Sequence, residues 1–271
     1  MFPHLTVEKN VGFGLEMRGI TGPEAARRIA EALELVSLGA YGHRYPKELS
    51  GGQQQRVAVA RALVVNPDVF LLDEPLSNLD AKLRQSVGMQ LRDLQKSLGL
   101  TTVFVTHDQK EALMMADRLV IMRAGRVVQE GSAEQLYAAP ASYFVADFLG
   151  HSNVLTGKVV PEGFLSAGGT LFRCDSAGVP ADRVMILRPE NLILGPAATG
   201  LPNSFEARIQ SITYLGAQSE VALALPGGDL LVATHQNRTG DSLTLRVGDR
   251  IAAGCRPEAV QLLVDDMTKT N

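Results

Sequence analysis

Two carboxylates at the end of an apolar segment are the first candidates for chemistry. Val69 to Leu72 is an uninterrupted apolar run, and Asp73 and Glu74 close it. Such a run predicts a buried parallel strand, and ligands of open α/β sheets bind at the carboxyl ends of such strands. One carboxylate there can hold Mg²⁺ while the other orients a water molecule. An Asp-Glu pair alone is more often a solvated strand end or a helix cap.

The second candidate is a glycine-containing string that stands directly before an expected helix, Leu49-Ser50-Gly51-Gly52-Gln53-Gln54-Gln55-Arg56. Glycines let a phosphate approach the backbone closely, and the N–H groups at a helix start favour an anion. Ser50 can both cap the helix and donate its hydroxyl. Ser-Gly-Gly alone favours a simple serine N-cap, and only the complete string outweighs that alternative.

His107 is the third candidate. It follows Thr101 to Val105, a β-branched segment expected to be a strand, and it therefore lies at a sheet edge where an imidazole can touch a phosphate oxygen. A lone histidine at such a place is usually structural. The remaining histidines have no carboxylate or cysteine partners at ligand spacing, so no metal is assigned to His4, His43, His151 or His235.

Alternating helices and strands are expected to position these residues. Apolar side chains recur at helical spacing in residues 21–36, 51–66, 79–98 and 109–116. Residues 119–122 and 127–129 predict a β-hairpin, and Ser132 with Gln135 predicts a capping box for one more short helix. Interleaved with the two strands, these helices predict an α/β fold.

The pattern changes around Gly150. Beyond it the apolar segments are short, glycine and proline interrupt them often, and no long helical pattern occurs. We therefore expect an α/β domain over residues 1–150 and an all-β domain, a small barrel, over residues 151–271. Strand candidates in the second domain are residues 208–213, 220–225, 230–233 and 250–253.

Composition excludes several classes of protein. The 271 residues carry 26 Lys plus Arg against 29 Asp plus Glu, a formal charge of -3, so no basic surface indicates a nucleic-acid partner. No apolar run approaches the roughly 18–20 residues that a membrane-spanning helix needs, and the start has no signal-peptide pattern. Cys174 and Cys255 are too few for a disulfide framework or a zinc cluster, which favours a reducing cytoplasm.

Taken together, the motifs resemble those of ABC ATPases in order and spacing. Residues 49–56 resemble the signature motif, residues 70–75 the Walker B motif, residues 76–80 the D-loop, and His107 the H-loop histidine. In the D-loop, Asn78 replaces a commoner alanine or glycine, which we interpret as a tolerated variant. The resemblance implies a P-loop NTPase fold, ATPase activity, and ATP and Mg²⁺ as cofactors.

The resemblance also implies a role for each residue. Asp73 would hold the magnesium, Glu74 would be the general base for the attacking water, and His107 would bridge the γ-phosphate and Glu74. Residues of the signature motif would reach the γ-phosphate of an ATP held by the opposite subunit, and the D-loop would cross the dimer interface; these residues are Ser50, Gly51, Gly52, Gln53 and, in the D-loop, Asp80.

The amino-terminal side departs from the family pattern. Phe2 to Val11 resembles the segment just after the Q-loop glutamine, yet neither that glutamine nor a G-x-x-x-x-G-K-[ST] phosphate loop occurs in the chain. We therefore expect a partial ATPase domain that is inactive alone, with strands at Val69 and Thr101 that lack a covering neighbour. A mispredicted start codon or an incomplete gene is the favoured explanation. A truncated product that pairs with an intact subunit is the alternative.

Beyond Gly150 the chain resembles the OB-like TOBE domain of importer ATPases, at Phe148-Leu149-Gly150, Ser152-Asn153, Leu187-Arg188-Pro189-Glu190, Tyr214-Leu215-Gly216 and Arg256-Pro257-Glu258. This subgroup serves polyamine, ferric iron, sulfate, sugar or phosphoglycerol importers, and residues 150–153 favour the polyamine or iron branch. The resemblance implies a homodimer or a second ATPase subunit, membrane permease subunits, and indirectly a solute-binding protein. It implies a peripheral position on the cytoplasmic face of the inner membrane and no nucleic acid.

Two other functions stay open at this stage. One is a soluble ABC ATPase of DNA repair or translation, for which coiled-coil or zinc insertions or a tandem second cassette would be expected; the sequence shows none. The other is a non-catalytic regulatory fragment, which the missing phosphate loop makes credible.

Overall fold

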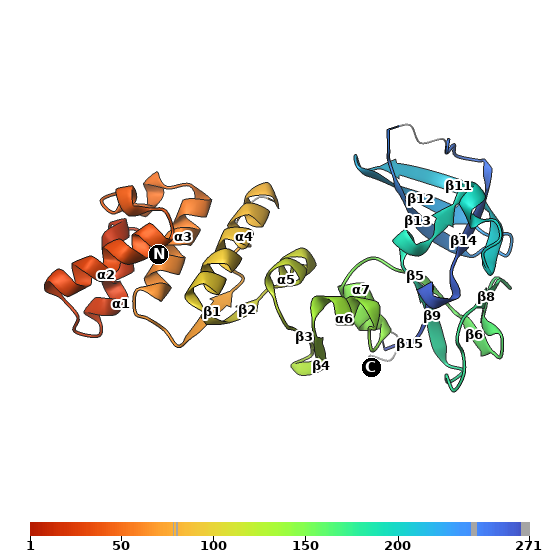
Figure 1. Cartoon of the computed structure of the whole chain (residues 1–271), viewed down its shortest axis with the longest axis horizontal. Coiled ribbons are helices and arrows are strands. Elements are labelled where there is room, and N and C mark those ends of the chain that lie inside the picture. Colours follow the sequence, from red (N-terminus) through yellow and green to blue (C-terminus); the bar gives the residue numbers. More distant parts are fainter. Residues whose placement is uncertain (78, 80, 240–242, 267–271) are drawn as a thin grey trace. The chain divides into compact units, whose positions relative to one another are not determined.

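The computed structural model describes residues 1–77, 79, 81–239 and 243–266. The chain forms two compact units, Met1–Asp117 and a second unit that begins at Arg118 (Figure 1). Asn78 and Asp80 of the expected D-loop lie outside the described residues. Among the described residues, no helix combines the length and the apolar character needed to cross a bilayer.

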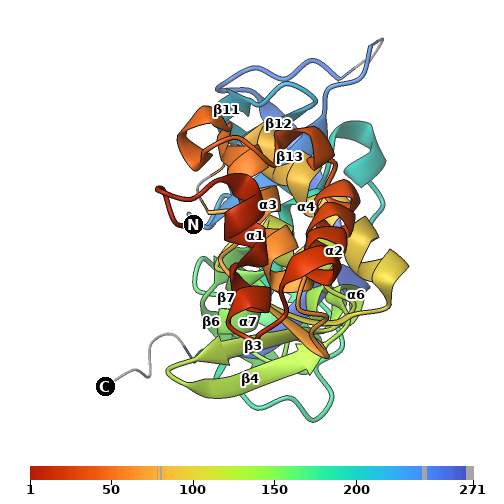
Figure 2. The same ribbon diagram turned by 90° about the vertical axis from the view of Figure 1, so that its left-hand side faces the viewer.

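The first unit begins with three helices, α1 (Val7–Glu16), α2 (Gly22–Leu35) and α3 (Gly51–Leu63), which pack on one another (Figure 2). Two 3-10 turns, Gly39–Tyr41 and Pro46–Glu48, connect α2 to α3. The helices α2 and α3 follow the predicted spacing, whereas α1 was not predicted. Their shared core is fully buried at Val7, Val11, Leu15, Val57 and Ala60.

The second half of this unit is a strand-helix-strand-helix segment, β1 (Val69–Asp73), α4 (Ala81–Leu98), β2 (Thr101–Val105) and α5 (Gln109–Met115). The two strands are parallel and pair from Val69 with Thr101 to Asp73 with Val105. One face of this two-stranded sheet packs into the helices, where Phe70 is 3% exposed. The carboxyl ends of both strands meet at one edge, as the α/β prediction requires.

The second unit opens with the predicted hairpin, β3 (Leu119–Arg123) and β4 (Arg126–Gly131). Its two-residue turn has positive φ at both Ala124 and Gly125, the geometry that matches the twist of two antiparallel strands. Helices α6 (Ala133–Ala138) and α7 (Tyr143–Phe148) follow. Ser132 and Gln135 form the predicted capping box, whereas α7 was not predicted.

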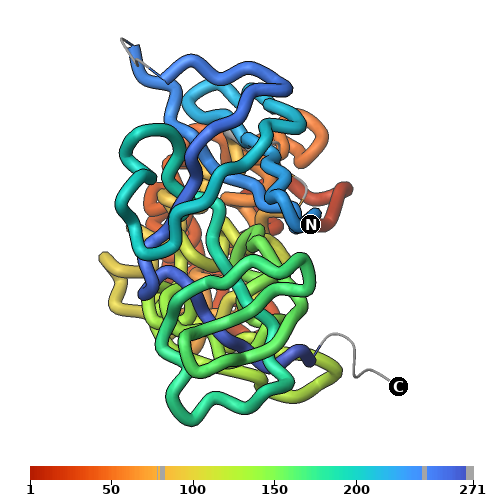
Figure 3. The backbone as a smooth tube through the Cα atoms, turned by 90° about the vertical axis from the view of Figure 1, so that its right-hand side faces the viewer, coloured from red at the N-terminus to blue at the C-terminus, as the bar shows by residue number. Residues whose placement is uncertain are grey.

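Three sheets build the rest of this unit, and the tube in Figure 3 follows their path. The largest has five strands in the order β10-β14-β11-β12-β13, and two three-stranded sheets have the orders β15-β9-β5 and β6-β7-β8. All four strand candidates fall in the five-stranded sheet. The strands are β5 (Asn153–Leu155), β6 (Gly157–Val160), β7 (Gly163–Ser166), β8 (Leu171–Arg173), β9 (Arg183–Leu187), β10 (Ile193–Leu194), β11 (Asn203–Tyr214), β12 (Gln218–Ala224), β13 (Leu230–Gln236), β14 (Arg250–Cys255) and β15 (Val260–Val264).

The expected domain boundary at Gly150 stays a prediction. Residues 118–150 pack in the same compact unit as the later strands. The buried guanidinium of Arg188 donates through Nη1 to the carbonyls of Ala146 and Gly150, at 2.8 and 2.7 Å, and stacks over the Tyr137 ring. Gln261 donates to the carbonyl of Ala138. These contacts join residues that are far apart in the sequence, so the change in composition at Gly150 could not predict them.

Candidate functional site

The carboxyl ends of β1 and β2 bring Glu74 and His107 into contact. The Nδ1 atom of His107 lies 2.8 Å from Oε1 of Glu74. The backbone N–H of Glu74 donates to the carbonyl of Val105 at 2.8 Å, which extends the parallel ladder by one residue and fixes the two loops side by side. Both side chains remain open to solvent, at 75% for His107 and 47% for Glu74.

Glu74 has an unusual backbone conformation. Its φ is 42°, in the left-handed region that costs a residue other than glycine about 1–3 kcal/mol. Ser77 holds the turn closed, because its backbone N–H and its hydroxyl both donate to the Glu74 carbonyl, at 3.3 and 3.0 Å. The turn redirects the chain at the sheet edge and leaves the carboxylate facing His107.

The contact changes the proton affinity of the histidine. The hydrogen bond to Glu74 and then the charge of that carboxylate raise the pKa of His107 above its ordinary value of 6.5. Because an ionised carboxylate can only accept, Nδ1 carries the proton in this contact. The Nε2 atom is thereby left to meet a further partner, as a donor when the ring is charged and as an acceptor when it is neutral.

Asp73 is the expected magnesium ligand. It is exposed at the last position of β1 and, within the described part of the chain, makes no side-chain hydrogen bond. The described residues contain no cluster of three His, Cys, Asp or Glu side chains that could hold a metal by themselves. Mg²⁺ commonly binds to one or two carboxylates and takes its other ligands from water and phosphates, so a single free carboxylate fits a magnesium that arrives with a nucleotide.

Ser50 is the N-cap of α3. Its hydroxyl oxygen accepts from the backbone N–H of Gln53 at 3.3 Å, and the Gln53 side chain accepts from the backbone N–H of Ser50 at 2.9 Å. Both the capping and the phosphate interpretations survive, because the hydroxyl proton of Ser50 is still available for donation. The Gln53 amide oxygen is engaged, but its NH₂ group stays available.

The two glycines of the signature string place α3 against α4. A Cβ at Gly52 would lie 3.3 Å from Leu83, and one at Gly51 would lie 3.5 Å from Leu79. Leu79, in the expected D-loop, is buried. Within the described residues, no hydrogen bond or ion pair joins the signature residues to Glu74 or His107. The structure therefore brings together one predicted pair, and leaves the signature residues at a separate helix start.

The turn after His107 is tied down by residues that the sequence analysis did not single out. Asp108 caps α5, since its Oδ1 accepts from the backbone N–H groups of Lys110 and Glu111, at 2.8 and 3.2 Å. Burial acts to raise the pKa of Asp108, but these two N–H groups and Arg84 outweigh it and hold the pKa below its ordinary value. Thr106 donates to Glu111 at 2.7 Å. An aspartate directly before a helical pattern is the sequence signal that could have identified this cap.

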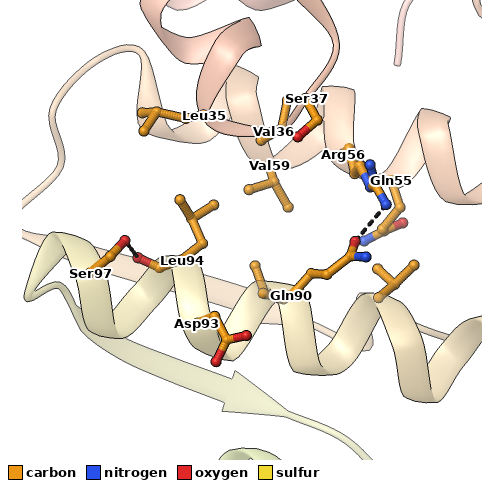
Figure 4. A pocket seen from close by; sticks show the side chains of 12 residues that line it. Leu35, Val36, Ser37, Gln55, Arg56, Val59, Gln90, Asp93, Leu94 and Ser97 are labelled. Carbon is orange, nitrogen blue, oxygen red and sulfur yellow. Dashed lines mark hydrogen bonds between the residues drawn. The ribbon is translucent and has the colours of Figure 1, made fainter.

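A groove of about 510 Å³ lies elsewhere in the first unit, between α3 and α4 (Figure 4). Val59 and Leu94 project into it from the two helices, and Arg56 donates to Gln90 near one end. Neither Glu74 nor His107 lines it. The groove is therefore not the candidate site, although Gln55 and Arg56 of the signature string contribute to its wall.

Comparison with known proteins places these features in one family. Residues 1–77 match the ABC transporter family and residues 185–263 match the TOBE domain. The fold and the paired loops thus define an ABC-type nucleotide-binding subunit that carries a TOBE domain.

Within that class, the similar relatives are subunits of importers. The chain is 46% identical to the Fe(3+) ions import ATP-binding protein FbpC of Brucella melitensis, over 86% of this chain and 66% of the relative. It is 43% identical to the spermidine/putrescine import ATP-binding protein PotA of Oleidesulfovibrio alaskensis, over 93% of this chain and 72% of the relative. The chain therefore belongs to the family of ABC import ATP-binding proteins, and it spans about two thirds of the length of the iron relatives it matches.

Proposed function

We propose that this chain is the ATP-binding and ATP-hydrolysing subunit of an ABC importer. The observation that carries the proposal is the contact between Glu74 and His107 at the carboxyl edge of two parallel strands, next to the free carboxylate of Asp73. This is the place where open α/β sheets bind ligands, and it joins a carboxylate base to an imidazole. Family membership makes ATP the substrate.

In the proposed mechanism, the Glu74 carboxylate accepts a proton from the water that attacks the γ-phosphate. The positive φ of Glu74 and the Ser77 hydrogen bonds hold this carboxylate at the sheet edge. His107 orients it through Nδ1 and presents Nε2 toward the phosphate. Asp73 would hold Mg²⁺, which supplies charge neutralisation for the transferring phosphoryl group.

The signature residues would bind phosphate at a second site, the N-terminus of α3. Ser50, Gly51, Gly52 and Gln53 lie at the start of α3, where N–H groups and the Ser50 hydroxyl proton can meet an anion. They make no hydrogen bond to the Glu74–His107 pair among the described residues, which is the arrangement expected if they serve an ATP held by a second subunit. We therefore propose a dimer, either of this chain or with another ATPase subunit.

The partners and the cargo follow from the relatives. Since their names describe iron and spermidine/putrescine import, we propose membrane permease subunits as direct partners, a solute-binding protein as an indirect one, and ferric iron or a polyamine as cargo. The chain would then work at the cytoplasmic face of the inner membrane. A role on nucleic acid is disfavoured by the net charge of -3.

The 271 residues themselves are proposed to be inactive in hydrolysis. They contain no G-x-x-x-x-G-K-[ST] motif, whose lysine and backbone N–H groups provide most of the grip on a triphosphate. The test is phosphate release by this chain and by a chimera in which the phosphate-loop segment of an ABC ATPase is fused in front of Met1. We expect turnover only from the chimera, and robust turnover by the chain alone would overturn this account of ATP binding.

The same chimera tests the site. Glu74→Gln should lower turnover by about 10²–10⁴-fold, the usual contribution of a general base, while ATP binding persists and size-exclusion chromatography detects a stable dimer. Ser50→Arg should instead prevent the ATP-dependent dimer. An active Glu74→Gln chimera, or an ATP-stable dimer of the Ser50→Arg chimera, would remove the residue from its proposed role.

A further inference from the structure

Arg84 connects the two loops that carry the candidate site. It lies in the first turns of α4, and its guanidinium has partners on both sides. Its Nη2 donates to the backbone carbonyl of Leu79 at 3.0 Å, in the loop that follows Glu74. Its Nη1 donates to Oδ2 of Asp108 at 2.8 Å, in the turn that follows His107. One planar side chain thus bridges the loop that contains Leu79 and the turn that contains Asp108, which lies 24 residues beyond Arg84 in sequence.

The third partner of Arg84 is Glu111, and losing Arg84 would leave this buried carboxylate without its cation. The Nε atom of Arg84 lies 3.4 Å from Oε1 of Glu111, an ion pair that falls short of hydrogen-bond geometry. The Glu111 side chain is only 5% exposed and also accepts from Thr106, the residue before His107. Burying a carboxylate is unfavourable unless it is paired, so Glu111 favours a fixed position of the Arg84 guanidinium. The fixed guanidinium in turn holds Leu79 and Asp108.

We propose that Arg84 is a positioning residue that keeps Glu74 and His107 within hydrogen-bond reach. The reason is geometric. Both residues of the pair are largely open to solvent, and an exposed ion pair by itself has little power to fix two loops. The less exposed contacts of Arg84 with Leu79, Asp108 and Glu111 supply that rigidity from the side. The consequence for hydrolysis rests on the proposed function, whereas the consequence for the pair does not.

The pKa of His107 depends on its contact with Glu74, so the geometry of the pair can be measured on this chain alone. His107 can be assigned among the five histidines by His107→Gln, and its pKa followed by NMR. Glu74→Gln defines the value without the contact. We expect Arg84→Lys to shift the His107 pKa down toward that reference, because lysine keeps the charge but cannot span three acceptors as a fork.

Electrostatics alone would give a different result. Arg84→Met removes a nearby positive charge, which by itself would raise the pKa of His107. A fall in both variants therefore reports lost positioning. If Arg84→Met fails to fold because Glu111 is left unpaired, Arg84→Lys still tests the proposal, because it keeps the positive charge beside Glu111. An unchanged His107 pKa in folded Arg84→Lys would overturn the proposal, even if that variant is less stable.

Arg92 provides a matched control on the same helix. Its guanidinium donates to the Met114 carbonyl at 2.9 Å and to Asp117 at 3.1 Å, and within the described residues no hydrogen bond or ion pair joins it to either loop of the site. Arg92→Lys should leave the His107 pKa unchanged. In the phosphate-loop chimera, Arg84→Lys should lower kcat on the order of tenfold with little change in KM, while Arg92→Lys should not. An inactive chimera would count against the proposed function alone, since the NMR result decides the positioning role.

Discussion

The two-stranded sheet of the first unit and the five-stranded sheet of the second unit differ in how far they expose their apolar side chains. In the first unit, the face of β1 and β2 that points away from the helices exposes Val69, Leu71, Val103 and Val105, at 46%, 71%, 50% and 53%. In the second unit, Ile209, Val221, Leu223 and Leu231 of the five-stranded sheet are at most 1% exposed. The first sheet has one covered face, whereas the second encloses a core with residues of the neighbouring strands.

The sequences of the strands already differ in this respect. The strand β12 alternates between buried and half-buried positions along its whole length, as expected for a sheet with one face on a core. The strand β1 is apolar on both faces, which is the pattern of a parallel strand covered on both sides. The exposed face of β1 and β2 is thus apolar, as is usual for a face that is buried. Such a face can be recognised because its apolar sequence pattern conflicts with its exposure.

Two adjacent residues of β1 test whether its two faces differ in burial. Phe70→Ala should lower the free energy of unfolding by about 3–5 kcal/mol, because the ring is 3% exposed and its removal leaves a cavity. Leu71→Ala should change it by only about 0.5 kcal/mol, because that side chain is 71% exposed. Urea denaturation followed by circular dichroism measures both. Equal losses for the two variants would mean that the outer face of the sheet is covered in solution.

Two adjacent residues of β13 provide the corresponding test in the second unit. Leu231→Ala in β13 should cost about 2–5 kcal/mol, since Leu231 is 1% exposed in the core of the second unit. Leu230→Ala should be close to neutral, since Leu230 is 58% exposed. The same denaturation experiment applies, read from the transition that belongs to the second unit. A large loss at Leu230 would show that this strand has a buried outer face as well.

The smallest expected effect concerns pH. Because the folded pKa of His107 is raised by Glu74, the contact stabilises the protonated ring. Its contribution is fully present below the unfolded pKa of 6.5 and is lost as the pH rises through the folded value. The stability difference between this chain and His107→Gln should therefore shrink as the pH rises above about 6.5, within the modest range of an exposed ion pair. A difference that grows with pH would contradict the assigned contact.

Much of the local structure could be predicted because its signals are short in range. Helical spacing of apolar residues can be recognised within a few turns, as in residues 22–35 and 81–98. A helix cap depends on neighbouring residues alone, as at Ser50 and Ser132. The helix α1 was missed although Val7, Val11 and Leu15 recur every four residues. Gly12 and Gly14 are poor helix formers in isolation, and packing of α1 against α3 overrides that preference. The short strands β5 to β8 offer too few residues for a pattern.

The resemblance to ABC ATPases with a TOBE domain could be read from the sequence alone, because motif order, strand ends and caps are local properties. The sequence also indicated Asp73, Glu74 and His107 as residues of one edge. The family resemblance implied that His107 meets Glu74, and the fold brings the two side chains to 2.8 Å across 33 residues of sequence. The role of Arg84 in joining their loops became visible only in the tertiary structure. Such contacts depend on strand pairing and helix packing, in which residues far apart in the chain become neighbours only when the whole unit folds.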